Sequence, residues 1–333
     1  MTGVRAMEPG RRLLVRRIGG EAVVLDLATG SYYRVAGAAV DVAEALARGE
    51  APAAVADRLA RRAGIDPRRA RGDVDAVAAA LAADGAPASR GDPAFAPAGD
   101  GLVLLWGDRP VLRVAGSGRR ASLLGDPASP PSPGERLRWA VPHLLWLAGG
   151  TVLHAAAVRL GGGVLALTGA SGSGKSTLAR LLAGGEEPIS GDLLLLRPGL
   201  AGPEAVLGGE AAGRAWEARE APRLAAGREA RLEAADLAAL TAGPSLPLAA
   251  IWVLDAARRV GEEIALSPAA GAEGLGLLLA QSFGETGAPK VWRRIFEASA
   301  GLAKAVPLFR ATVPATLPAL SEAAGRYRAS VAS

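Results

Sequence analysis

The chain has 333 residues, of which 50% are hydrophobic and 21% are charged. It is therefore long enough for about two domains with a sizeable core, and it is not a disordered chain. It contains no cysteine and two histidines, His143 and His154, which excludes a disulfide scaffold, a thiol nucleophile, a cysteine zinc site and a histidine-rich metal centre. The first residues lack an apolar signal-peptide core, so we expect a cytoplasmic location.

The formal net charge is +5, and all but three of the 38 basic residues are arginines. A basic balance can indicate a nucleic-acid partner. Here the arginines alternate with acids along the chain, so we expect a solvated surface and no nucleic acid. The uncharged stretch Ala140–Val158 is long enough to span a membrane, but Pro142 and Gly149-Gly150 interrupt it. We therefore predict the end of a buried helix, a turn and a buried strand, with no membrane contact.

The first 85 residues have the pattern of a small α+β domain. Three short apolar runs predict strands, separated by turns at Gly19-Gly20 and at Ala28-Thr29-Gly30. Three stretches with apolar residues at helical spacing follow, and two of them begin at a proline. Three strands and then three helices indicate a winged-helix-type fold. The strands are Leu13–Ile18, Ala22–Leu27 and Ser31–Val35; the helical faces are Val40, Ala43 and Leu46, then Val55 and Leu59, then Val74, Val77 and Leu81.

The run VVLDLATGSYYRV (Val23–Val35), together with the helical remainder, resembles the PqqD-like family, whose members bind leader peptides of ribosomally made, modified peptides. The resemblance implies that a leader adds a strand beside the third strand and packs on the third helix. An exposed strand edge offers unpaired N–H and C=O groups for such pairing. The alternatives are a winged helix that binds DNA or one that only packs on the next domain. The implied peptide-binding residues are Ser31, Tyr32, Tyr33, Arg34, Val35, Val74, Val77 and Leu81.

Residues 86–100 (APASRGDPAFAPAGD) are rich in Pro, Ala and Gly and lack periodicity, which predicts a linker. We therefore expect a first domain over 1–85 and a second over 101–333.

The strongest motif is GASGSGKST at Gly169–Thr177, which fits the phosphate-binding loop pattern G-x-x-x-x-G-K-[ST]. The context also fits, because the run before it, Val164–Thr168, predicts a buried strand and Leu178–Leu182 predicts a helix. Glycines let the loop turn and bring N–H groups to phosphates, and the helix N-terminus favours anions. The predicted nucleotide-binding residues are Gly169, Ala170, Ser171, Gly172, Ser173, Gly174, Lys175, Ser176 and Thr177.

Two further features flank this loop. The predicted strand Thr151–Leu160 (TVLHAAAVRL) precedes it and carries His154, which comes near the phosphates if the two strands form a hairpin. After it, Asp192 opens the predicted strand Leu193–Leu196. This combination resembles HPr kinase and its kinase-like relatives, which implies an α/β P-loop fold related to phosphoenolpyruvate carboxykinase. The acidic motif of that family is commonly a pair of aspartates, whereas this chain reads Gly191-Asp192.

The resemblance implies ATP- and Mg²⁺-dependent phosphoryl transfer. Lys175 would pair with the β- and γ-phosphates, while Ser176 would hold Mg²⁺. Asp192 would act as the base toward the acceptor, as a metal ligand, or as both. His154 would bind a phosphate oxygen or hold Asp192.

Weaker candidates have ordinary structural interpretations. Pro247–Asp255 has the shape of a Walker B strand. Asp255 could support a metal from behind its direct ligands, but the simpler prediction is the end of a strand. Arginines alternate with acids at Glu210, Arg214, Glu217, Arg219, Glu220 and Arg223. They could line a phosphate channel, but the simpler prediction is a salt-bridged surface. His143 and the pair Trp292 and Phe296 are predicted to be structural.

The sequence as a whole predicts a kinase that phosphorylates a hydroxyl, most simply Ser, of a precursor peptide recruited through its leader, with lasso-peptide precursors as the first substrate class. Two alternatives stay open. The second domain could be a nucleotide-binding switch that serves as an adaptor, or the chain could be a small-molecule kinase whose first domain is only structural. The oligomeric state is not predicted.

Overall fold

The computed structural model describes residues 13–27, 30–82, 94–255, 261–282 and 289–332. The predicted turn residues Ala28 and Thr29, the first part of the predicted linker and most of the loop predicted at Gly284–Lys290 lie outside these ranges. No helix in the described ranges combines the length and the apolar character needed to cross a membrane.

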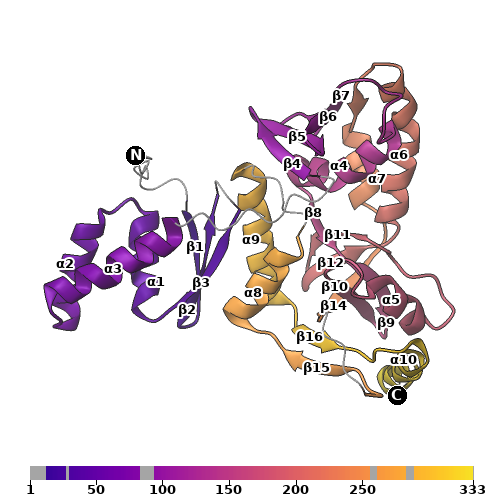
Figure 1. Cartoon of the computed structure of the whole chain (residues 1–333). Helices are drawn as coiled ribbons and strands as arrows, with labels where there is room; N and C mark the ends of the chain where they lie inside the picture. Colours follow the sequence, from indigo (N-terminus) through magenta and orange to yellow (C-terminus); the bar gives the residue numbers. More distant parts are fainter. Residues whose placement is uncertain (1–12, 28–29, 83–93, 256–260, 283–288, 333) are drawn as a thin grey trace.

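The N-terminal part consists of a three-stranded antiparallel sheet and three helices, as predicted (Figure 1). The strand order is β1-β2-β3, so β3 is an edge of this sheet. Helix α2 begins with Pro52 in its first turn and ends at Gly64, whose φ of 63° suits glycine. The elements are β1 (Leu13–Ile18), β2 (Glu21–Asp26), β3 (Tyr32–Ala36), α1 (Ala38–Ala47), α2 (Pro52–Ala63) and α3 (Pro67–Ala82).

Both faces of this sheet are covered. Val24 belongs to a core shared with α1–α3, against which Tyr33 and Val35 also pack. The neighbours Val23 and Leu25 face the other way and join the large core that includes α8 and α9, because successive side chains on a strand point to opposite faces. The sheet therefore packs on the rest of the chain, and Figure 1 shows it beside α8 and α9.

A second, five-stranded antiparallel sheet has the order β13-β7-β6-β5-β4. Its edge strand β4 corrects the linker prediction, since residues 94–98 are a strand paired with β5. The composition did not indicate this strand, because Pro97 and the alanines around it have a low propensity for β-strands. The strands are β4 (Ala94–Ala98), β5 (Gly101–Trp106), β6 (Arg109–Val114), β7 (Arg120–Leu123) and β13 (Ala230–Arg231).

The largest sheet has eight strands and contains the phosphate-loop strand. Its centre is parallel: β10 pairs with β14, and β14 pairs with β16. β9 and β10 form an antiparallel hairpin. The single strand predicted over Thr151–Leu160 was wrong, because it is divided at Ala155 and its first half, with His154, pairs with β11 instead. The strands are β8 (Thr151–His154), β9 (Ala156–Leu160), β10 (Gly163–Gly169), β11 (Leu193–Gly199), β12 (Gly202–Val206), β14 (Ser245–Leu254), β15 (Ala265–Pro268) and β16 (Leu308–Thr312).

Helices surround these two sheets. α4 begins at a capping box formed by Ser132 and Glu135 and ends before Gly149 (φ 100°); β8 follows, as predicted for the uncharged stretch. Trp292 and Phe296 are buried core residues, as predicted. The helices are α4 (Pro133–Ala148), α5 (Lys175–Ala183), α6 (Gly209–Ala225), α7 (Ala234–Thr241), α8 (Gly271–Ala280), α9 (Pro289–Ala305) and α10 (Leu317–Ala332).

Candidate nucleotide and acceptor site

The phosphate-loop motif has the expected context, since β10 leads into it and α5 begins at Lys175. Gly169, Gly172 and Gly174 have φ angles of 146°, 76° and 92°, a region that L-residues with side chains rarely adopt. A Cβ atom on Gly169 would lie 2.8 Å from the Leu254 carbonyl oxygen and 2.9 Å from Ser173 Oγ. Both the backbone conformation and the available space therefore require glycine there.

Lys175 is folded into this loop. Its Nζ donates to the carbonyl oxygens of Gly169 (2.8 Å) and Ala170 (3.2 Å), and its side chain is buried. Burial lowers the pKa of Lys175, while the nearby charge of Asp192 acts in the opposite direction. The ammonium group thus binds backbone oxygens at the start of the loop itself.

The helix end of the loop lies beside Gly191. Ser176 Oγ donates to the Gly191 carbonyl oxygen at 3.2 Å. The hydroxyl is therefore next to the acidic segment that opens β11, and Thr177 follows it in the first turn of α5.

His154 and Asp192 form a close pair. His154 Nε2 lies 2.7 Å from Asp192 Oδ1 because β8 and β11 pair in a register that sets His154 opposite Leu193. The Thr168 hydroxyl donates to the His154 carbonyl oxygen at 2.9 Å and ties this strand to β10. The hydrogen bond with His154 is the main cause that lowers the pKa of Asp192. The Asp192 carboxylate is 69% exposed, so an incoming group can reach it.

Glu210, in the first turn of α6, contacts the same segment. Its Oε2 accepts hydrogen bonds from the N–H of Gly191 at 2.6 Å and from that of Asp192 at 3.4 Å. Its other oxygen pairs with Arg214. The Glu210 side chain is only 13% exposed, so its charge lies at the edge of the site rather than in bulk water.

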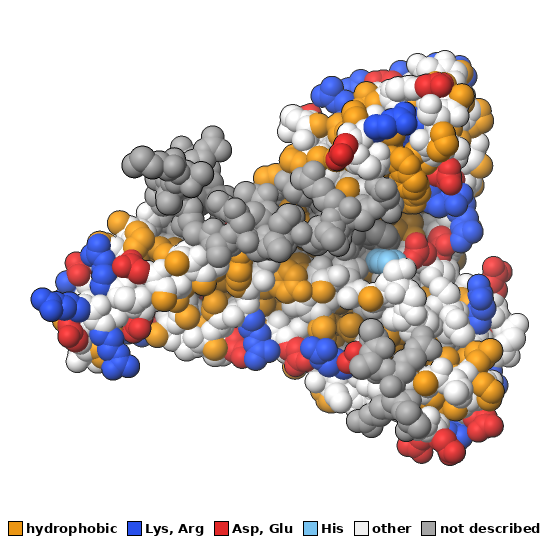
Figure 2. All heavy atoms as spheres, in the orientation of Figure 1, with side chains coloured by type: hydrophobic (Ala, Val, Ile, Leu, Met, Phe, Trp, Pro, Cys, Tyr) orange, Lys and Arg blue, Asp and Glu red, His pale blue; other side chains and the backbone are white. Residues whose placement is uncertain are grey.

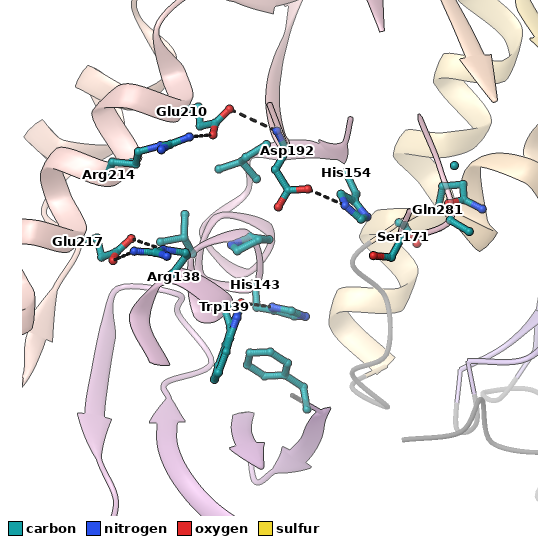
Figure 3. A pocket seen from close by; sticks show the side chains of 18 of the residues that line it. Arg138, Trp139, His143, His154, Ser171, Asp192, Glu210, Arg214, Glu217 and Gln281 are labelled. Carbon is teal, nitrogen blue, oxygen red and sulfur yellow. Dashed lines mark hydrogen bonds and ion pairs between the residues drawn. The ribbon is translucent and has the colours of Figure 1, made fainter. Parts of the chain in front are cut away.

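A pocket of about 620 Å³ opens beside these groups. Figure 2 shows the surface hollowed around a histidine, between the β4–β7 part and the phosphate-loop part, and Figure 3 shows the pocket from close by. Its polar end carries the His154–Asp192 pair and the start of the phosphate loop. The lining also includes Phe95, Arg138, Trp139, Val141, Pro142, His143, Leu193, Glu210, Gly213, Arg214, Glu217 and Gln281.

The opposite wall of the pocket is aromatic. Phe95 and His143 stack with ring centroids 3.7 Å apart, and Trp139 stacks on Trp106 at 5.2 Å. His143 Nδ1 lies 3.2 Å from the Trp139 carbonyl oxygen, which fits the structural role predicted for this histidine. The wall combines with the charged pairs Arg138–Glu217 and Arg214–Glu210 to give a pocket that is apolar on one side and polar on the other.

The Walker-B-like strand lies where its pattern suggests. β14 is parallel to β10, with Leu254 opposite Gly169, so Asp255 follows directly beside the start of the phosphate loop. Ligands of open α/β sheets bind at this carboxyl edge of the strands. The acids and arginines of α6 form ion pairs, as predicted: Arg214 with Glu210, and Arg219 and Arg223 with Glu220.

The residues predicted to bind a peptide divide into two groups. Tyr32, Arg34 and Ala36 of the edge strand β3 are exposed, and Tyr33 and Val35 are half-buried; Ser31 directly precedes the strand. On α3, Val77 is half-buried. Val74 and Leu81 are 0% and 2% exposed and belong to the core of the domain itself. Their inclusion in a surface groove was wrong, because the helical face on which they lie is turned toward α1 and α2.

The residues present fit a nucleotide with Mg²⁺. Mg²⁺ takes oxygen ligands and keeps several waters, so it needs only one or two carboxylates beside the phosphates. Ser176 Oγ and the Asp192 carboxylate supply such oxygens at the segment 191–192. No group of three or more His, Cys, Asp or Glu that could hold a metal ion by itself occurs in the described part of the chain, so the phosphates would have to complete the coordination.

The sequence analysis missed the contribution of β4 and α4, and for α6 it ranked a channel-lining role below an ordinary salt-bridged surface. Phe95, Trp139, Glu210 and Arg214 reach the pocket from elements far from the motif in the chain. The spacing of Glu210 and Arg214 indicated an ion pair on a helix, but nothing in it indicated contact with the amides of residues 191–192.

Two segments of this chain match known protein families. Residues 21–86 match the family "Coenzyme PQQ synthesis protein D (PqqD)", and residues 160–210 match the family "ABC transporter". No match was found among curated proteins. A solved structure, "TbiB1 in Complex with the TbiA(beta) Leader Peptide", is 22% identical over 26% of this chain and 100% of that chain, with a TM-score of 0.22, which is too low to support an argument. The chain thus combines an N-terminal PqqD-like region with a P-loop-type nucleotide-binding region.

Proposed function

We propose that this protein is an ATP-dependent, Mg²⁺-dependent kinase that phosphorylates a hydroxyl, most simply that of Ser, in a ribosomally made precursor peptide in the cytoplasm. Its domains are a winged-helix-type leader-binding domain over 1–85 and a P-loop kinase domain over 101–333, related to HPr kinase and phosphoenolpyruvate carboxykinase. The observation that carries the proposal is the His154–Asp192 pair, 2.7 Å apart, at the point where the pocket meets the start of the phosphate loop.

The pocket is assigned to the acceptor because of the part of the loop that lines it. Gly169, Ala170 and Ser171 line it, whereas Ser176 and Thr177 do not. In a phosphate-binding loop the Lys reaches the β- and γ-phosphates, and Lys175 is hydrogen-bonded to Gly169 and Ala170. The terminal phosphate would therefore lie on the pocket side, with the hydroxyl entering opposite it.

In the proposed step the acceptor oxygen forms a bond to the γ-phosphorus, and the bond from that phosphorus to the β,γ-bridging oxygen breaks. ADP leaves, and the hydroxyl proton passes late to the Asp192 carboxylate. His154 orients that carboxylate. Lys175 and the loop N–H groups neutralise charge on the phosphates, and Mg²⁺, which Ser176 and Asp192 would help to hold, would supply further charge neutralisation.

The N-terminal domain would supply the peptide. An edge strand with outward N–H and C=O groups is suited to strand addition, and β3 is such an edge. A leader held there raises the effective concentration of the attached core peptide at the pocket. The match of residues 21–86 to PqqD supports this role.

One observation favours a second candidate, a nucleotide switch that acts as an adaptor. Position 191 is Gly, so the acidic segment itself carries a single carboxylate, Asp192. A small-molecule kinase is the third possibility, and in it the N-terminal domain would have no part in substrate binding.

Asp192→Asn tests the kinase against the switch. The full chain is incubated with candidate precursor peptides from the neighbouring genes, ATP and Mg²⁺, and the peptides are weighed by mass spectrometry. We expect a gain of about 80 Da per phosphate with the unaltered chain, lost in Lys175→Met. In Asp192→Asn transfer should fall about 10²–10⁴-fold, far more than the ATP affinity falls. No mass gain with any peptide despite ATP binding would instead support the switch or the small-molecule kinase.

A further inference from the structure

The space beside Gly191 is occupied by a carboxylate that comes from elsewhere in the chain. A Cβ atom built on Gly191 would have both carboxylate oxygens of Glu210 as its nearest neighbours, each 3.9 Å away. The Glu210 carboxylate is also bound to the Gly191 amide at 2.6 Å. An acidic group thus lies next to the point where an aspartate side chain at 191 would begin.

We propose that Glu210 supplies the second carboxylate of the nucleotide centre, in place of an acidic side chain at position 191. This inference rests on the nucleotide binding of the proposed function, but not on the identity of the acceptor. The segment Gly191-Asp192 has one carboxylate in its sequence, and Glu210 in the first turn of α6 brings a second carboxylate next to it (Figure 3).

The contacts of residue 191 place Glu210 near the phosphates. The carbonyl oxygen of Gly191 accepts from Ser176 Oγ at 3.2 Å, while its N–H donates to Glu210. A single residue therefore joins the loop hydroxyl expected at the metal to the Glu210 carboxylate. Asp192, the other carboxylate, follows directly and donates its own N–H to Glu210 at 3.4 Å.

Glu210 is also built into the site rather than loose on its surface. It is 13% exposed and paired with Arg214, which is 73% exposed. Gly209, just before it, packs against Leu195, since a Cβ there would lie 2.5 Å from a Leu195 methyl carbon. This close approach of α6 to β11 fixes the start of the helix and hence the Glu210 side chain.

The charge of Glu210 has a consequence that a purely structural role would lack. With Mg²⁺ present, a second carboxylate strengthens the hold on the cation and its nucleotide. Without Mg²⁺, the same carboxylate repels the phosphates. Removing the charge should therefore lower nucleotide affinity in Mg²⁺ but not in its absence.

The test is calorimetric titration of the full chain with the β,γ-imido analogue of ATP, in Mg²⁺ and in EDTA. Glu210→Gln keeps an oxygen that can accept the two amides but removes the charge. We expect its affinity to fall about tenfold in Mg²⁺ and to be unchanged or higher in EDTA. Adding Gly191→Asp to this variant should restore the Mg²⁺-dependent affinity, because Gly191 has no positive φ and nothing lies closer than 3.9 Å to its Cβ position.

The matched control is Glu220→Gln. Glu220 lies on the same helix, accepts the Arg231 amide at 3.0 Å and pairs with Arg223, but it does not line the pocket. It should leave both affinities unchanged. Equal losses for Glu210→Gln in Mg²⁺ and EDTA would reduce Glu210 to a backbone support, and no loss in Mg²⁺ would overturn its role. If the unaltered chain bound the analogue neither in Mg²⁺ nor in EDTA, both this inference and the proposed function would be wrong.

Discussion

His154 and Asp192 illustrate how two neighbouring strands build one functional pair. The chain passes from β8 to β9 at Ala155, whose amide donates to the Asp192 carbonyl oxygen at 3.1 Å. This backbone bond fixes the distance between the two strands just where the histidine and the aspartate face each other. The pair is therefore held by the pairing of β8 with β11.

His154→Ala should move the acid limb of the pH–rate profile to higher pH. The hydrogen bond with His154 is the main cause of the lowered pKa of Asp192. Without it that pKa rises, and at a given acidic pH a smaller fraction of the carboxylate is ionised to act as the base. Rates of phosphate transfer measured between neutral and acidic pH check this. His154→Gln, which keeps an N–H donor, should show a smaller shift. A uniform loss of rate with an unmoved acid limb would mean that His154 contacts phosphate instead.

At this scale the sequence predicts what is local. Lys175 and Ser176 follow from a continuous motif, and the link of His154 to Asp192 could be proposed because each adjoins a recognisable strand. The contact of Glu210 with residues 191–192 could not be predicted. Glu210 lies 18 positions after Asp192 in the chain, and only the packing of α6 on β11 brings the two together. The prediction that Val74 and Leu81 bind a peptide was wrong for a related reason. Their spacing predicts one face of a helix, but it does not show whether that face points to the core or to solvent.

Among the elements, the β10–α5 junction depends most on one residue, Gly169. Gly169→Ala should lower ATP affinity about tenfold or more, because a φ of 146° and carbonyl contact at 2.8 Å impose strain of roughly 1–3 kcal/mol on a non-glycine residue. Calorimetric titration with ATP measures this. The control is Gly162→Ala in the β9–β10 hairpin, where no atom lies within 4 Å of the Cβ position and φ is not positive. Equal affinities for the two variants would contradict the account.

The elements that could be predicted are those with a clear period of hydrophobic residues or a clear residue signal at their start or end. The three N-terminal strands and three helices follow from alternation, helical spacing and proline starts. β4 and β13 could not be found in the same way, because one is rich in Ala and Pro and the other has two residues. Their strand character comes from pairing with β5 and β7, which are partners that local sequence does not specify. The parallel order of β10, β14 and β16 is likewise set by packing between distant segments.

At the scale of the whole molecule, α8 links the two halves of the proposed function. Leu275 and Leu279 belong to the same core as Val23 and Leu25 of the N-terminal sheet. Gly276 approaches Tyr32, since a Cβ there would lie 3.6 Å from the ring, and Ala280 and Gln281 at the end of α8 line the pocket. Deleting the first domain would therefore expose apolar surface beside the site. Loss of activity on truncation would not separate peptide recognition from lost packing.

A single substitution on β3 can distinguish a loss of peptide recognition from a loss of packing. Asp26 N–H donates to the Ser31 carbonyl oxygen at 2.8 Å. Hydrogen-bonded pairs alternate along an antiparallel ladder, so the N–H of Arg34 points away from β2 and toward an added strand. Arg34→Pro removes this donor without breaking the β2–β3 ladder, because proline is tolerated on an edge. Arg34→Ala removes the same side chain, with its ion pair to Glu21, but keeps the N–H.

For a peptide kinase, Arg34→Pro should weaken binding of the precursor peptide about tenfold relative to Arg34→Ala. This corresponds to about 1.4 kcal/mol of binding free energy, the amount expected for one hydrogen bond between strands. ATP affinity should be the same in both variants, since the phosphate loop is untouched. Fluorescence anisotropy of labelled candidate peptides, with calorimetry for ATP, gives both values. Equal peptide affinities would remove strand addition at β3 from the proposal. Phosphate transfer to a small acceptor, equal in the two variants and independent of any leader, would point instead to a small-molecule kinase.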